Sequence, residues 1–60
     1  MTTLTLELTE DQSWALAELY KRISYTDFRN LSKNDDEANA MRDGVYELAK
    51  ALKEQGFNPR

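Results

Sequence analysis

Acidic side chains are the residues of this chain whose type and spacing could do chemistry, and three stand together at Asp35, Asp36 and Glu37. A calcium loop needs oxygen ligands at alternating positions, Gly at its sixth position and Glu at its twelfth. Counted from Asp35, the sixth residue is Ala40 and the twelfth is Tyr46, and a start at Asp36 puts an alanine at the third position. Because both registers fail, the sequence predicts no metal site here and favours a helix N-terminus.

Catalytic sets are missing elsewhere in the chain. The sequence contains no Cys and no His, so a serine nucleophile would lack its ordinary base. General acid–base catalysis needs a carboxylate that is shielded from water, and the three acids stand among polar neighbours. The two glycines are far apart, which excludes a phosphate-binding loop. We therefore predict a protein that is not an enzyme and binds no cofactor.

A second set of acidic residues lies along one face of the predicted second helix. Its members fall at offsets of 0, 7, 11 and 18 residues, within about 20° of one line along a helix, and are Asp36, Asp43, Glu47 and Glu54. This acidic stripe lies opposite Val45 and Leu52, and it fits a solvated face that Lys50 and Lys53 partly neutralise. The sharper alternative is a row of carboxylates that occupies Lys and Arg side chains with which a partner binds phosphates.

Trp14 is the second candidate for contact with a partner. In the predicted first helix it lies on the side away from Leu16 and Ile23, near Asp11 and Glu18. A large aromatic side chain with a polar tip is common at binding hot spots. The alternative is that Trp14 packs under the N-terminal strand or the C-terminal tail.

Three elements have to position these residues. Polar and apolar residues alternate over residues 3–8, which predicts a strand formed by Thr3, Leu4, Thr5, Leu6, Glu7 and Leu8. A capping box at Thr9 and Gln12 predicts a helix over residues 10–23, and apolar spacing predicts a second helix over residues 35–55. Residues 24–33 are expected to form a loop with a short helical turn, and residues 56–60 a tail. The predicted fold is mostly helical α+β, in the order β-α-α.

The predicted core combines the apolar faces of the three elements. Phe28, Tyr25 and Leu31 of the short turn are expected to cover it, and Gly44 suggests a close approach by another group. The core residues proper are Leu16, Leu19, Ile23, Met41, Val45, Leu48 and Leu52, packed against Leu4, Leu6 and Leu8.

Length and composition indicate one small domain whose own core is too small for high stability, so that it needs a partner subunit. Sixty residues bury little surface on folding, and without Cys or His neither disulfides nor the commonest metal ligands are present. A lone strand leaves an exposed edge, so we expect a homodimer in which residues 3–8 of two copies pair.

The net charge of −3 makes direct binding to nucleic acid or to a membrane surface unfavourable. No leader or membrane span is visible, and we expect a cytoplasmic protein.

A strand followed by two helices resembles the ribbon–helix–helix dimers, whose paired strands enter the DNA major groove. That resemblance implies a repressor that reads DNA through Thr3, Thr5 and Glu7. The glutamate and a dimer charge of −6, twice −3, argue against DNA binding. The predicted link between the helices, residues 24–33, is also longer than the short turn of that family.

A second resemblance covers the full length. The segments LTLELTEDQ, TDFRNL, DDEANAMRDG and EQGFNPR are similar to short proteins of bacterial plasmids, prophages and integrative elements. Anti-CRISPR proteins are similar in size, charge and lack of motifs, and this resemblance implies an inhibitor of a host protein. The partner expected from it is a basic nucleic-acid-binding surface in a bacterial host, met by the acidic stripe.

Overall fold

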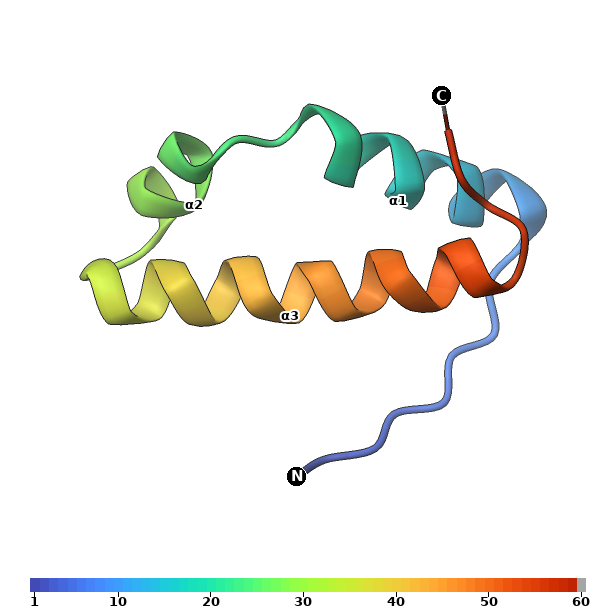
Figure 1. Ribbon diagram of the computed structural model, residues 1–60, viewed down its shortest axis with the longest axis horizontal. Helices are drawn as coiled ribbons and strands as arrows, with labels where there is room; N and C mark the ends of the chain where they lie inside the picture. Colours follow the sequence, from blue (N-terminus) through green and yellow to red (C-terminus); the bar gives the residue numbers. More distant parts are fainter. Residues whose placement is uncertain (60) are drawn as a thin grey trace.

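The computed structural model describes residues 1–59, and within them the chain forms three helices and no strand (Figure 1). They are α1 (Glu10–Arg22), α2 (Tyr25–Leu31) and α3 (Asp35–Glu54). α1 and α2 follow one another along the same side of α3 and each packs against it. The molecule is therefore two helices thick, with Cα extents of 33 × 28 × 15 Å.

The start of α1 is fixed by the capping box that the sequence predicts. The Gln12 N–H donates to Thr9 Oγ1 at 3.1 Å, and the Thr9 N–H donates to Gln12 Oε1 at 3.0 Å. These two bonds satisfy backbone donors that a helix start leaves without a partner. The prediction of a helix from residue 10 is confirmed, and its end differs by one residue because Ile23 adopts an extended conformation as the C-cap.

The expected short turn is α2, which has its own capping box. The Asp27 N–H donates to Ser24 Oγ at 3.4 Å, and the Ser24 N–H donates to Asp27 Oδ2 at 2.8 Å. Phe28 is buried as predicted, whereas Tyr25 and Leu31 are exposed, which corrects the prediction for both. Tyr25 and Leu31 are the first and last residues of this seven-residue helix, whereas Phe28 is its middle residue.

α3 begins at the Asn34 cap, where the Glu37 N–H donates to Asn34 Oδ1 at 2.8 Å. It ends in a Schellman motif, in which the Gly56 N–H donates to the Lys53 carbonyl and the Phe57 N–H to the Leu52 carbonyl. Gly56 has a φ of 97°, a conformation that favours glycine. Both ends of α3 lie within a residue of the predicted ones.

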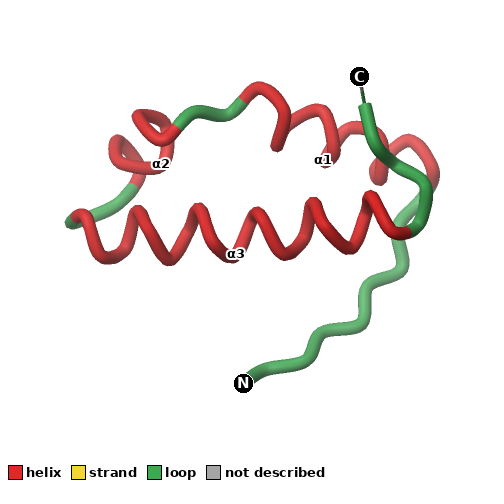
Figure 2. The backbone as a smooth tube through the Cα atoms, viewed as in Figure 1, coloured by secondary structure: helices red, strands yellow, loops and turns green. Residues whose placement is uncertain are grey.

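The predicted N-terminal strand is wrong. Residues 1–8, which we call the arm, are extended but pair with no other segment of the described chain, and Figure 2 shows them as loop. Thr and Leu alternate in this segment as they do in a strand. A strand also needs a neighbouring backbone that forms hydrogen bonds with its N–H and C=O groups. The β-α-α fold, its α+β class, the strand pairing across a dimer and the ribbon–helix–helix topology are all corrected by this helical fold.

Small residues occupy most of the buried positions. Ala17, Ala38 and Ser13 are buried together with Phe28 and Leu52. Ser13 Oγ donates to the Thr9 carbonyl at 2.9 Å, so its hydroxyl is satisfied inside the helix. Small side chains let α1 and α2 approach α3 closely, and the large apolar residues close the edges of the contact.

The predicted core is partly wrong. Leu52 is buried as predicted, but Leu19, Leu4, Leu6 and Leu8 are exposed. The remaining predicted core residues are half-buried; they are Leu16, Ile23, Met41, Val45 and Leu48. Without a sheet to cover them, these side chains meet one neighbouring layer and keep one side open to water.

Candidate interaction surface

Two of the three consecutive acids at the start of α3 have structural partners. Asp35 Oδ1 lies 2.6 Å from Arg29 Nε, which ties α2 to the beginning of α3. Glu37 Oε1 accepts the Lys33 N–H at 3.0 Å, and Glu37 Oε2 lies 4.0 Å from Lys33 Nζ. Both carboxylates also lie in the first turn, where the helix dipole favours negative charge. Asp36 alone of the three has no such partner in the described residues.

The acidic stripe is exposed along its whole length. Its members alternate with the small and apolar residues of α3 so that all four point away from the α1–α2 layer; they are Asp36, Asp43, Glu47 and Glu54. Asp43 Oδ1 lies 3.3 Å from Arg42 Nη2, the one ion pair within 4.0 Å that the described residues give the stripe. Three carboxylates are therefore available to an external cation.

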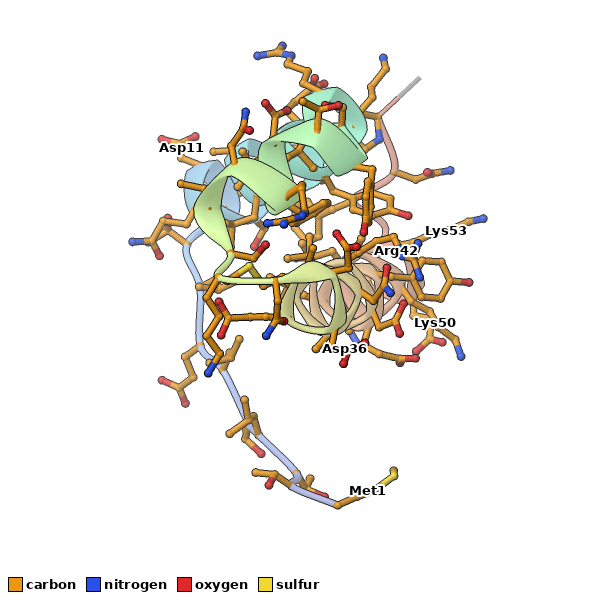
Figure 3. The ribbon with its side chains drawn as sticks, turned by 90° about the vertical axis from the view of Figure 1, so that its left-hand side faces the viewer. Met1, Asp11, Asp36, Arg42, Lys50 and Lys53 are labelled. Atoms are coloured by element: carbon orange, nitrogen blue, oxygen red, sulfur yellow. The ribbon has the colours of Figure 1, made fainter. Side chains whose placement is uncertain are left out.

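The cations of α3 lie on one flank of the helix rather than across the stripe. Arg42, Lys50 and Lys53 project to the same side in Figure 3, while Asp36 points down from the helix. Neither Lys50 nor Lys53 is within 4.0 Å of a carboxylate in the described chain. The predicted neutralisation of the stripe by these lysines is thus not seen as contacts, although Lys50 and Lys53 line the same groove as Glu54.

A tyrosine cluster accompanies the cations, and the sequence analysis missed it. The Arg42 guanidinium lies 5.8 Å from the centre of the Tyr25 ring, and the Tyr20 and Tyr46 rings are 6.3 Å apart. Tyr20 and Tyr46 line a groove of about 620 Å³ between α1, α3 and the tail. The sequence signal for this cluster is a spacing that places four residues on one side of α3: Arg42, Tyr46, Lys50 and Lys53.

Trp14 packs on the C-terminal tail and keeps part of its surface exposed. Its ring meets Phe57 edge to face, with centroids 5.2 Å apart and an angle of 77° between the planes. Asp11 is exposed on the same side of α1, and Glu18 Oε2 forms an ion pair of 3.0 Å with Arg22. The packing accounts for one side of the indole, and 39% of the residue remains accessible.

The structure separates the two predicted contact regions. Asp11 lies at the left-hand side of α1 in Figure 3, whereas Asp36 lies below α3. Asp11 and Glu18 lie on the side of α1 opposite Ser13 and Ala17. The two predicted regions therefore lie on different helices, and the labelled acids Asp11 and Asp36 face different sides of the molecule.

The described residues also limit two other classes of site. Among residues 1–59 no three acidic side chains come together in an arrangement that could hold a metal ion. None of the three helices has the length and apolar character required to cross a membrane.

The chain belongs to a family of unknown function, DUF7706, whose model matches residues 1–60. Neither the curated proteins nor the solved structures contain a match to this chain.

Proposed function

We propose that this protein is a small non-catalytic inhibitor from a bacterial mobile element, of the anti-CRISPR type. In this proposal it acts in the cytoplasm of its host, and the acidic stripe of α3 covers a basic nucleic-acid-binding surface of a host protein. Carboxylates at helical spacing would occupy the Lys and Arg side chains that otherwise contact phosphates.

The observation that carries the proposal is the exposed row of four carboxylates, of which three have no cation within 4.0 Å in the described residues. Lys50 and Lys53 form no ion pair with the stripe in the described residues, which supports the proposal because these carboxylates can contact an approaching basic surface. Arg29 and Lys33 are bound to Asp35 and Glu37, so the acids that serve the fold differ from those of the stripe.

The test uses the wild-type protein and a stripe variant, D36N/D43N/E47Q/E54Q, as bait in a lysate of the host. The amide replacements keep the shape of each side chain and remove its charge, so retained helicity in circular dichroism is expected. We expect the wild type to capture a nucleic-acid-binding protein and to displace a labelled oligonucleotide from it. The stripe variant should fail in both assays, and capture by the wild type should weaken steeply with added salt.

The matched control is E7Q/E10Q/D11N/E18Q, which removes four acids from the arm and α1. Both variants change the net charge from −3 to +1, so a loss confined to the stripe variant assigns the effect to position rather than to total charge. Equal capture by the stripe variant and the wild type would contradict the proposal. Loss in the control with retention in the stripe variant would move the contact to the Trp14 side.

A further inference from the structure

A groove on the side of α3 away from the tyrosine cluster is lined by apolar side chains and remains open. Its volume is about 590 Å³, and its walls are the arm on one side and the C-terminal half of α3 on the other. The apolar lining includes Leu4, Leu6, Leu8, Leu48, Ala51 and Leu52. Of the described residues that line it, Glu7 alone carries a charge, so its occupant should be an apolar segment.

The arm itself cannot fill this groove, because it already forms one wall. Thr9 caps α1 with its backbone extended, and the chain before it leaves the helical layers and projects past α3 (Figure 1). Exposure rises from 37% at Leu8 to 58% at Leu6 and 76% at Leu4. The leucines of the arm thus line the groove but keep much of their surface exposed, and the groove itself remains open.

The exposed area supports a second copy as the occupant. The chain exposes 5095 Å², whereas a compact monomer of 7.0 kDa is expected to expose about 4,000 Å². Covering the excess of about 1,000 Å² on each of two copies would bury about 2,000 Å² in total, which lies where standard interfaces meet those of obligate homodimers. Few side chains are buried within one chain, so an interface of this size would add substantially to its core.

Dimensions agree with this assignment. An extended segment from Leu4 to Leu8 spans about 13 Å, and α3 from Leu48 to Gln55 spans about 10 Å. Leucines at alternate positions of an extended segment all point to one side, so Leu4, Leu6 and Leu8 can enter the groove together.

We propose that the protein is an arm-exchanged homodimer, in which the leucines of each arm lie in the groove between the arm and α3 of the other copy. The contact is isologous, because each copy gives its arm and receives its partner's. It depends on side-chain packing and requires no strand. The stripe borders this interface on α3 without lining the groove, so the dimer and the proposed inhibitor function can be tested separately.

The first experiment measures mass by sedimentation at protein concentrations from micromolar to hundreds of micromolar. The wild type should have the mass of a dimer, and L4S/L6S should be a monomer with unchanged helicity, because these leucines are not packed inside the helical layers. The matched control is L19S/L31S, which removes two equally exposed leucines from α1 and α2, outside the groove. It should remain a dimer. A wild-type monomer throughout, or an L4S/L6S dimer, would overturn the proposal.

The second experiment uses the absence of cysteine in the natural sequence. Single variants L6C and A51C are mixed and oxidised, and a disulfide between the two different chains is expected because Leu6 of one copy lies near Ala51 of the other. L31C mixed with A51C serves as the control and should give little product. If L6C with A51C gives no more product than that control, or if only the double variant L6C/A51C closes within one chain, the arm is not exchanged and the proposal is wrong.

Discussion

Ala38 shows at the scale of one residue how this small protein holds its helices together. It is 0% exposed and lies on the face of α3 that meets the other layer, in a molecule whose large apolar side chains are mostly half-buried. A methyl group at that position lets the neighbouring helix come close, and close approach gives dispersion contacts to many atoms at once. Small buried residues thus contribute to the stability of the fold together with the buried large ones, Phe28 and Leu52.

Ala38→Leu is therefore expected to destabilise the fold by about 1–3 kcal/mol, because a larger side chain must force the layers apart. Chemical unfolding followed by circular dichroism measures the change. Ala40→Leu is the matched control, since Ala40 lies two residues away on the same helix and is exposed. Equal stability of both variants would show that Ala38 does not lie at the contact.

Leu52 is the buried large aliphatic residue of α3, and its carbonyl also accepts the Phe57 N–H in the Schellman motif. Leu52→Ala should cost about 2–5 kcal/mol, a large part of the stability of a domain this small. The melting temperature of this variant should fall well below that of Leu31→Ala, which removes an exposed leucine from α2. A similar melting temperature for the two variants would contradict the assigned core.

At the scale of the elements, the sequence predicted the ends of α1 and α3 to within a residue, because short-range hydrogen bonds determine where a helix begins and ends. The capping box at Thr9, the Asn34 cap and the stop at Gly56 each involve residues within five positions of one another, so they can be identified in the sequence. The strand at residues 3–8 could not be judged in this way, because a strand exists only where a second backbone lies beside it. Leu19 is a comparable case. Apolar spacing predicted that it faces the core, but Ser13 and Ala17 are the buried residues of α1, because the face of a helix that meets its neighbour depends on the tertiary packing.

For the candidate site too, features within one helix could be predicted from the sequence, and features that depend on two helices could not. Exposure of Asp36, Asp43, Glu47 and Glu54 follows from their phase on one helix, and the sequence predicted it correctly. The position of Trp14 relative to that stripe depends on how α1 lies on α3, which no local pattern contains. The same holds for the meeting of Tyr20 with Tyr46, and of Arg42 with Tyr25, from different helices.

The two glycines give an element-scale prediction with opposite signs. Gly56→Ala should destabilise α3 by about 1–2 kcal/mol, because its φ of 97° brings a Cβ atom into conflict with the backbone. Gly44→Ala should stabilise the monomer by about 0.5–1 kcal/mol, because an added Cβ meets nothing within 4 Å and a helix interior favours alanine. The close approach predicted at Gly44 is absent from the described chain.

Thermal unfolding of both glycine variants, each made in the L4S/L6S background, measures these changes in the absence of association. Comparison with L4S/L6S itself isolates the backbone effect. Changes of the same sign at both positions would contradict the conformational explanation. Destabilisation by Gly44→Ala in the wild-type background alone would indicate that a second copy covers this part of α3.

At the scale of the whole molecule, the thin fold and its large exposed area lead us to predict a stability that depends on association. An arm-exchanged dimer unfolds to two separate chains, so each tenfold rise in concentration adds about 1.4 kcal/mol in favour of the folded dimer. For a protein of this size that corresponds to a rise of about 5 °C in melting temperature. We expect this slope for the wild type and for L19S/L31S, between micromolar and hundreds of micromolar protein.

L4S/L6S should lose the slope and melt at one temperature at every concentration, near or below that of the most dilute wild type. The difference arises because its folding no longer includes a bimolecular step, while α1, α2 and α3 keep the contacts described above. Scanning calorimetry at three or more concentrations measures the slope directly. A wild-type melting temperature that is independent of concentration would mean that the three helices are stable as a monomer and that the arm contributes nothing to folding.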